Sequence, residues 1–388
     1  MPIKKRQHQE GSFYKGYRLS CFLRKRLSLT THTTVPHKSC LRELPSNAMG
    51  SFGWDEEWAA SFGVPSTGVD PKPPSEDVFQ MREQIHSTMK IFMDMVPPVP
   101  DVQQSEPIPF TSFDGTTQHI TRFGSKDDST TTVPSPAIVY IHGGGFIANS
   151  VSIFSPRIAQ LAHGTGLPVY ALSFRLSPEY TASTILEDVL AGLRHVAARA
   201  EVDERRVVLV GDSSGGGQAL GAVLMARDRG YLEKEFRLAR VVLVMPALDH
   251  KTRLEEGSEK ARFLTWTSPS NEMVWNAYLW GHDGKSGHNL EGGVDSDIAV
   301  YASPSLAKDL TGLPPTFIEV GNLDLFYEED MEMARSMMRD GVDVELHVWP
   351  GVPHGFDGGA GTSSLARRSM EVRFQAIRRS VGLPVVKE

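Results

Sequence analysis

The stretch RVVLVGDSSGGGQALGAVLMAR, residues 206–227, decides the fold. It begins with the apolar run 207–210, which is typical of a strand buried on both faces of a parallel sheet. A turn of glycine and serine follows, and then a run of small and apolar residues typical of a buried helix. A strand, a sharp turn and a helix in direct succession predict one unit of an α/β protein.

The turn at the centre of this stretch has the pattern Gly-x-Ser-x-Gly, with Gly211, Ser213 and Gly215 at its fixed positions. Between a strand and a helix, this pattern forms a sharp turn that presents the serine hydroxyl above the sheet. Side chains at the two glycines are expected to clash there. The serine would lie at a helix N-terminus, where N–H groups favour developing negative charge. We therefore predict that Ser213 is a nucleophile flanked by Asp212 and Ser214; the alternative is an ordinary turn of small residues.

Strand-like and helical segments alternate along the rest of the chain. Short runs of β-branched and aromatic residues predict strands, and longer runs with apolar residues at helical spacing predict helices. The predicted strands are 108–113, 117–123, 137–141, 168–174, 206–211, 240–246, 315–321 and 343–349. The predicted helices are 183–200, 214–227, 268–279, 328–339 and 365–379. The alternation predicts an α/β fold with a mostly parallel central sheet and helices on both faces.

A further helix is predicted at 76–95, before the first strand, with Ser75 as its N-cap. Its apolar residues recur at helical spacing and are rich in methionine: Val78, Met81, Ile85, Met89, Phe92 and Met95. Such a face suits either packing in the core or an adaptable lid over an apolar ligand, because methionine side chains fill irregular space. The sequence leaves both interpretations open.

A second glycine-rich motif, His142-Gly143-Gly144-Gly145, directly follows the predicted strand 137–141. Adjacent glycines leave the backbone free to point several N–H groups at one spot, as the stabilisation of an oxyanion requires. The N–H of Ser214 is expected to be a further donor. A flexible turn is the alternative. A phosphate loop is disfavoured, because no Gly-Lys-Ser/Thr follows.

An acid and then a histidine should follow such a serine in the chain. Asp324 follows the predicted strand 315–321, and His354 follows the predicted strand 343–349. Both therefore lie at C-terminal strand ends, where open α/β sheets build their sites. We predict that His354 accepts the Ser213 proton on Nε2 and that Asp324 orients the imidazole.

Three rival acids, Glu328, Glu329 and Asp330, lie just beyond Asp324. Their position within the next predicted helix favours a solvent-exposed face over a role in the site. The other histidines show no spacing typical of metal ligands, so no metal and no cofactor are predicted.

These motifs resemble the hormone-sensitive-lipase-like group of α/β hydrolases, a lipolytic esterase family marked by His-Gly-Gly-Gly and Gly-Asp-Ser-Ala-Gly. The likeness runs from about residue 109 to the C-terminus and includes SFRLSPEYTASTILEDV at 173–189, SPSLAKDLTGLPPTFIEVGNLD at 303–324 and VWPGVPHGF at 348–356. It implies the α/β-hydrolase fold and a catalytic triad of Ser213, Asp324 and His354. The residues it implies for the oxyanion hole are Gly143, Gly144, Gly145 and Ser214. The supporting motif residues are His142, Gly211, Asp212 and Gly215.

The resemblance also implies a helical cap, built from 49–105 and an insertion at roughly 250–300 of a catalytic domain that spans 106–388. Cap residues such as Trp266, Trp275 and Trp280 would then influence substrate choice. The sequence departs from the family at Ser214, which replaces the usual alanine, at Gly217, which replaces a common asparagine, at Tyr180 and Thr181, and at Leu325, which replaces a proline. None of these departures removes a catalytic group.

The resulting expectation is a serine hydrolase that cleaves small or medium acyl esters through an acyl-enzyme intermediate. An amidase or deacetylase, or an acyltransferase, would use the same triad and stays open. A non-catalytic ligand-binding protein on this fold is disfavoured, because His354 is retained. The expected partner is a small-molecule ester, and either a monomer or a homodimer is compatible with the sequence.

Bulk properties narrow the function further. The 388 residues carry a net charge of −7, so a nucleic-acid partner is not expected. No apolar run approaches the ~18 residues of a membrane span. Residues 1–48, which hold both cysteines and are basic and rich in serine and threonine, predict a disordered or targeting extension. A cytoplasmic location is expected, or a mitochondrial one if that extension is a transit peptide.

Overall fold

A mostly parallel sheet forms the centre of the protein. The computed structural model describes residues 52–70, 74–125, 133–281, 296–358 and 363–384, all within the unit Gly50–Glu388. In this part of the chain the strands follow the order β1-β3-β5-β4-β6-β7-β8-β9, and β2 also pairs with β3. The strands are β1 (Val102–Gln104), β2 (Ile108–Thr111), β3 (Thr117–Ser125), β4 (Ser135–Ile141), β5 (Val169–Leu172), β6 (Val202–Asp212), β7 (Leu238–Val244), β8 (Thr316–Gly321) and β9 (Val344–Trp349). The strands from β4 onward pair in parallel, whereas β3 pairs antiparallel with β1, β2 and β5.

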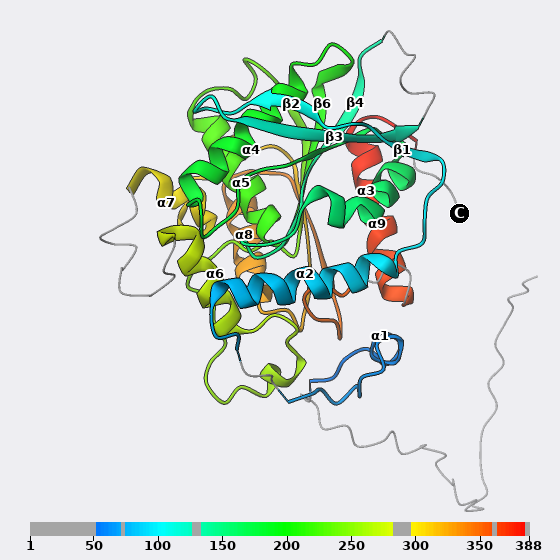
Figure 1. Cartoon of the computed structure of the whole chain (residues 1–388), viewed down its shortest axis with the longest axis vertical. Coiled ribbons are helices and arrows are strands. Elements are labelled where there is room, and N and C mark those ends of the chain that lie inside the picture. Colours follow the sequence, from blue (N-terminus) through cyan, green and yellow to red (C-terminus); the bar gives the residue numbers. More distant parts are fainter. Residues whose placement is uncertain (1–51, 71–73, 126–132, 282–295, 359–362, 385–388) are drawn as a thin grey trace, which may run out of the picture. The chain divides into compact units, whose positions relative to one another are not determined.

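Helices cover both faces of this sheet. They are α1 (Glu56–Ser61), α2 (Val78–Asp94), α3 (Val151–Thr165), α4 (Ala182–Ala197), α5 (Ser214–Asp228), α6 (Ser268–Trp280), α7 (Ser296–Ala302), α8 (Tyr327–Arg339) and α9 (Ser364–Ser380), with short 3-10 turns η2 (Glu259–Phe263) and η3 (Pro304–Leu306). Figure 1 shows α3 and α9 on one side of the sheet and α4, α5 and α8 on the other. The predicted α/β fold, with a mostly parallel sheet between helices, is confirmed.

Side-chain alternation along each strand creates one hydrophobic core on each face, because successive residues of a strand point to opposite sides. On β4, Val139 and Ile141 join the core under α4, α5 and α8, whereas Ile138 and Tyr140 join the core under α3 and α9. Both faces of the central strands are therefore apolar and buried, which explains the continuous apolar runs in the sequence.

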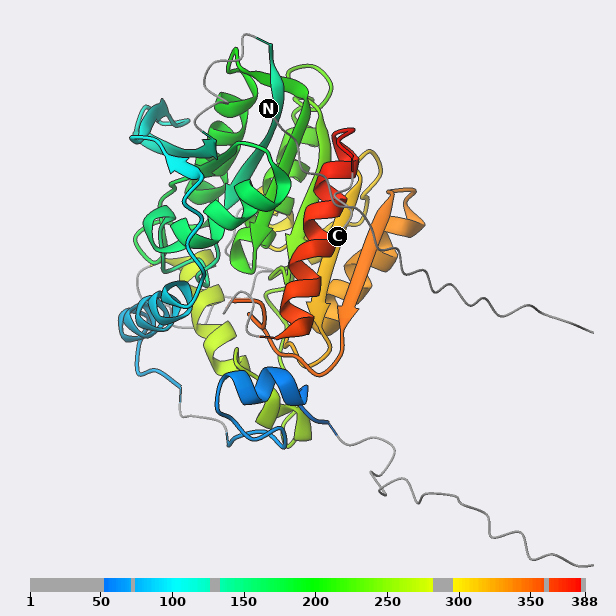
Figure 2. The same cartoon turned by 90° about the vertical axis from the view of Figure 1, so that its right-hand side faces the viewer.

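The strands that follow β4 and β6 in the chain lie on opposite sides of this neighbouring pair in the sheet. After β4 the chain crosses through α3 to β5, whereas after β6 it crosses through α5 to β7 on the opposite side. The loops after these two neighbouring strands therefore diverge at the carboxyl ends of the strands, which is where open α/β sheets bind ligands. Figure 2 shows the strands of this sheet pointing toward the end of the molecule where α2, α6 and α1 lie.

Some predicted boundaries and elements were wrong. The sequence patterns missed β1, α3 and α7. Helix α3 contains Pro156, which normally interrupts a helix, so the sequence favours a break there. The N-cap of α2 is Asp77 rather than Ser75, because the Asp77 carboxylate accepts the N–H groups of Phe79 and Gln80, both at 2.8 Å.

The methionine-rich face of α2 is buried in part. Val78 and Met81 join the core shared with α6, and Met93 is buried near the other end of the helix. Met95, which the helical spacing placed on the same face, is 40% exposed. The first two residues therefore pack as core. The proposed domain limits remain predictions, and the extension at 1–48 lies outside the described residues.

Candidate active site

Ser213 occupies a strained turn between β6 and α5. Its φ of 55° and ψ of −121° are rarely adopted by a residue with a side chain, and such strain is often found at functional sites. The Ser213 N–H donates to the carbonyl of Val244 at 2.8 Å, and its own carbonyl accepts the N–H of Gly216 at 2.8 Å. These bonds hold the turn in place, so the hydroxyl is presented at the sheet's carboxyl end.

The flanking glycines make this turn possible. A Cβ at Gly211 would lie 2.3 Å from the carbonyl oxygen of Gly215, and one at Gly215 would lie 2.4 Å from that of Ile141. Each neighbour is backbone and cannot move aside. The predicted clash at these two positions is therefore confirmed.

Ser213, His354 and Asp324 form a continuous hydrogen-bonded line. The Nε2 of His354 lies 2.9 Å from the Oγ of Ser213, and its Nδ1 lies 2.8 Å from Oδ2 of Asp324. Asp324 is fully buried, and its Oδ1 accepts the N–H of Phe326 at 3.0 Å. The structure thus brings together the three residues that the sequence predicted, which come from the loops after β6, β9 and β8.

The loop that carries His354 is held by residues that sequence reasoning missed. The hydroxyl of Thr265 donates to the His354 carbonyl at 2.7 Å, and the N–H of Gly355 donates to the sulfur of Met245 at 3.2 Å. The ring of Phe326 meets the imidazole edge-on, with centroids 5.1 Å apart. No sequence motif marks these residues, because each meets the histidine only through the fold.

The glycine loop after β4 faces the serine. A Cβ at Gly143 would lie 3.2 Å from the Cβ of Ser213, so the loop approaches the nucleophile closely. Gly144 and Gly145 have φ values of 138° and 59°, which favour glycine. Within the described part of the chain, no residue accepts a hydrogen bond from the N–H of Gly144, Gly145 or Ser214. These donors therefore remain available to a ligand.

His142 supports the loop from within the core. Its ring stacks between Phe174 and Phe154, at centroid distances of 4.5 and 5.8 Å, and its Nδ1 lies 2.9 Å from the Gly143 carbonyl. Burial is the main cause that lowers the pKa of His142 to about 4. The ring is therefore neutral at pH 7 and donates from Nδ1 to the carbonyl, which fits the predicted supporting role of His142.

A buried network of charges supports the turn from the α3 and α9 side. Asp212 accepts the hydroxyl of Tyr140 at 2.6 Å and the Nε of Arg157 at 3.2 Å. Arg157 also pairs with Asp357, which in turn pairs with Arg373. Burial alone would raise the pKa of Asp357, but the two arginines outweigh it and hold that pKa well below its usual value. This carboxylate is therefore charged at neutral pH.

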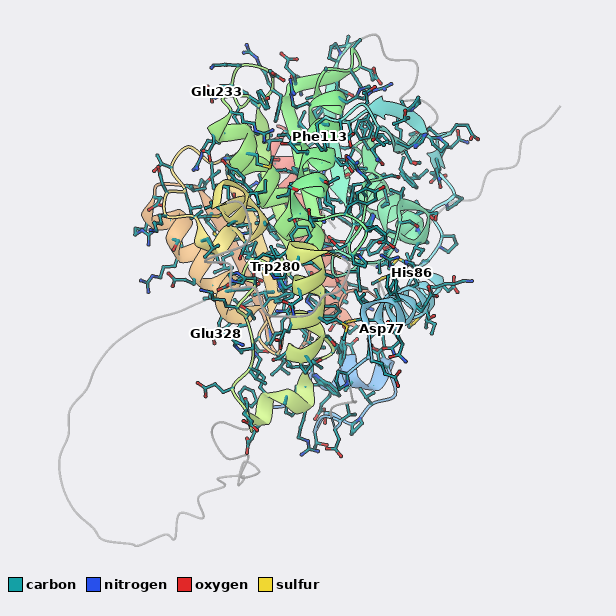
Figure 3. The ribbon with its side chains drawn as sticks, turned by 60° about the vertical axis from the view of Figure 1, so that its left-hand side comes forward. Asp77, His86, Phe113, Glu233, Trp280 and Glu328 are labelled. Carbon is teal, nitrogen blue, oxygen red and sulfur yellow. The ribbon has the colours of Figure 1, made fainter. Side chains whose placement is uncertain are left out.

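On the opposite side of the sheet, the prediction of an exposed acidic face on α8 was wrong for two of its three residues. Asp330 is fully buried, and Glu329 is half-buried and accepts the N–H of Leu248 at 2.7 Å. Glu328 is exposed and visible on the surface in Figure 3. Asp330 lies three and four residues before the buried Met333 and Ala334, so helical spacing does mark it as inward-facing.

Asp330 has no compensating partner in the part of the chain that the structure describes. Neither of its carboxylate oxygens has a hydrogen-bond partner among the residues that the structure describes. Burial, and then the charges of Glu329 and Asp324, raise the pKa of Asp330 well above its usual value. Burial likewise raises the pKa of Glu329. Both groups therefore favour the neutral acid form.

Comparisons with known proteins agree with this architecture. A family model described as the α/β-hydrolase fold matches residues 138–358. The ethyl acetate hydrolase of Pseudomonas putida is 27% identical over 231 residues, which is 57% of this chain and 65% of that protein. The acetyl-hydrolase of Streptomyces hygroscopicus is 28% identical over 252 residues, 63% of this chain and 76% of that protein. The aligned region thus spans less than two thirds of the first relative.

A solved structure extends the likeness beyond the family match. A bacterial heroin esterase superposes with a TM-score of 0.70 and 29% identity, covering 85% of this chain and 98% of that one. No helix in the described residues combines the length and apolarity needed to span a membrane. The family match alone covers more than half of the chain, so this protein belongs to the α/β-hydrolase fold family, in its hormone-sensitive-lipase-like group.

Proposed function

We propose that this protein hydrolyses carboxylic esters of small or medium acyl chains through an acyl-enzyme on Ser213. The observation that carries the proposal is the line of contacts from the Ser213 hydroxyl to His354, at 2.9 Å, and on to Asp324, at 2.8 Å. A serine hydroxyl is a weak nucleophile until a base within hydrogen-bond reach accepts its proton.

In the first half-reaction, Ser213 Oγ attacks the ester carbonyl and its proton passes to His354 Nε2. Asp324 stabilises the imidazolium through Nδ1–H. The carbonyl oxygen becomes an oxyanion, and the free N–H groups of Gly144, Gly145 and Ser214 are the candidate donors for it. The C–O bond to the alcohol then breaks, and the alcohol leaves with the proton from His354.

In the second half-reaction, a water molecule replaces the alcohol. His354 takes a proton from the water, whose oxygen attacks the acyl carbon. Collapse of this second intermediate breaks the bond to Ser213 Oγ, which regains the proton from His354 and releases the carboxylic acid. Small acyl groups are suggested by relatives that are named for ethyl acetate and acetyl hydrolysis.

The test compares two neighbouring serines in the full-length chain. Ser213→Ala should lower kcat/KM for p-nitrophenyl acetate by about 10⁴-fold or more, because the nucleophile is lost. Ser214→Ala removes only the adjacent hydroxyl and keeps its N–H, so its loss should be far smaller. Equal losses, or a wild-type protein that is inert toward esters from acetate to palmitate, would contradict the proposal.

A further inference from the structure

The three cap tryptophans differ in what they contact. Trp275 is buried and packs against Phe146 at a centroid distance of 4.7 Å. Trp280 lies at the C-terminal end of α6, as Figure 3 shows. Trp266 lies in the segment between η2 and α6, and its indole is 6.2 Å from the imidazole of His354. Of the three, Trp266 is the one that meets a residue of the proposed triad.

Trp266 also borders the glycine loop. Its Cη2 would lie 3.0 Å, and its Cζ2 3.4 Å, from a Cβ placed on Gly145. The far edge of the indole thus rests on the loop that holds the candidate oxyanion donors, while the ring also faces the proposed base. One side chain therefore lies against two parts of the site that act on different atoms of an ester.

Hydrogen bonds fix this indole in place. Its Nε1 donates to Oδ1 of Asn271 at 3.2 Å, and the buried Asn271 donates through Nδ2 to the Thr252 carbonyl at 2.9 Å. The preceding residue, Thr265, donates to the His354 carbonyl at 2.7 Å. Because both the ring and its backbone are anchored, Trp266 forms a preorganised wall.

The atoms of the reaction decide which part of the ester this wall borders. The carbon under attack carries Ser213 Oγ, the oxyanion, the alcohol oxygen and the acyl carbon. The oxyanion must face the glycine loop, and the alcohol oxygen must reach His354 Nε2 to receive its proton. The acyl carbon takes the remaining direction. A side chain that borders both the loop and the histidine therefore lies beside the alcohol group.

We propose that Trp266 is a specificity-determining residue that limits the size of the alcohol part of the ester. The proposal rests on the function proposed above and adds a prediction about which half of the substrate is restricted. One extra or missing methylene group against the wall of a pocket changes the preference between two substrates by roughly 10- to 200-fold.

The experiment measures two ratios in the full-length protein. The first is kcat/KM for cyclohexyl acetate over that for ethyl acetate, followed by titration of the released acid. The second is kcat/KM for p-nitrophenyl octanoate over that for p-nitrophenyl acetate. In Trp266→Ala the alcohol ratio should rise by about tenfold or more. The acyl ratio should stay within the factor of about three expected from a change of ~0.6 kcal/mol.

Two further variants make the result decisive. Phe113→Ala, an aromatic truncation at an exposed position just after β2, should leave both ratios near the wild-type values. Trp266→Phe keeps an aromatic ring, so it should give a smaller rise in the alcohol ratio and serves if the alanine variant does not fold.

A change in the acyl ratio alone, or no change in either ratio, would overturn the assignment of Trp266 while leaving ester hydrolysis intact. A wild-type protein without activity on any of these esters would instead overturn the proposed function. The two failures are thus separable.

Discussion

Two pairs of acids, Glu319 with Asp357 and Glu329 with Asp330, lie on opposite faces of the sheet, and they differ in whether an arginine accompanies them. On the α3 and α9 side, Asp357 and Glu319 each pair with Arg373, at N–O distances of 2.5 Å. On the α8 side, Asp330 is fully buried and Glu329 is half-buried, and neither has an ion pair among the described residues. Asp357 and Asp330 are buried to a similar degree, and they differ in whether an arginine pairs with the carboxylate.

This difference shows that burial does not by itself decide whether an acid is charged. Burial penalises the charged form, whereas a nearby cation restores it. The pKa of Asp357 is lowered and that of Asp330 is raised, although burial acts in the same direction on both. Asp330 is therefore a buried acid near the proposed triad that favours its neutral form. It adds no full negative charge beside Asp324.

Removal of the shared cation should have the largest effect. Arg373→Met leaves Glu319 and Asp357 buried with fewer partners, and breaking such a pair typically costs about 3–5 kcal/mol of stability. Urea unfolding followed by tryptophan fluorescence at pH 7 measures this loss. Arg368→Met, on the exposed face of the same helix, should change stability by no more than about 0.5 kcal/mol. Equal effects of the two substitutions would contradict the comparison.

Matched asparagine substitutions should give opposite pH dependence. The pKa of Asp330 is raised in the folded state, so the wild type loses stability as pH rises above about 4, the value in the unfolded chain. Asp330→Asn removes this loss. The difference in unfolding free energy between the variant and the wild type should therefore shift in favour of the variant as pH rises, by on the order of 1 kcal/mol at pH 8.

Asp357 has a lowered pKa, so it stabilises the fold above pH ~4 and loses that contribution as pH falls. Asp357→Asn should therefore be destabilising at pH 7, and its deficit should shrink in acid. Unfolding free energies of both variants from pH 2 to pH 8 provide the measurement, because the effect for Asp357 falls below pH ~4 and that for Asp330 above it. Parallel pH profiles for the two variants would show that the acids do not differ in charge.

The smallest effect is expected for Glu329→Gln. If Glu329 is already neutral, an amide of the same shape can still accept the Leu248 N–H, and stability at pH 7 should change by less than about 1 kcal/mol. Glu319→Gln makes the same chemical change beside Arg373 and should cost more, because it removes a charge that the arginine needs. The comparison fails if the glutamine at 329 proves as costly as that at 319.

The parts of the site that the sequence predicted are those fixed by local backbone geometry. Ser213 and the glycines of both motifs were recognisable because a tight turn or a close approach demands specific residue types at fixed spacing. Asp324 and His354 were placed by their position after strands. For these residues, chain order and strand ends carry enough information.

The parts that escaped prediction depend on contacts between distant segments. The hydrogen bond from Thr265 to the His354 carbonyl joins residues 89 positions apart in the sequence, and no local pattern predicts it. Helix α3 was missed because Pro156 is tolerated there against its usual preference. Asp330 was misplaced because its charge was given more weight than its helical spacing relative to Met333 and Ala334.

The backbone angles of Ser213 also restrict which chemistry the position can acquire through evolution. A φ of 55° is especially unfavourable for a side chain branched at Cβ, so threonine could not replace serine here without distorting the turn. Cysteine has the same branching as serine and fits the same backbone. A single substitution to cysteine can therefore replace the oxygen nucleophile with a sulfur one on this backbone. A substitution to threonine, whose hydroxyl is a secondary alcohol, would distort the turn.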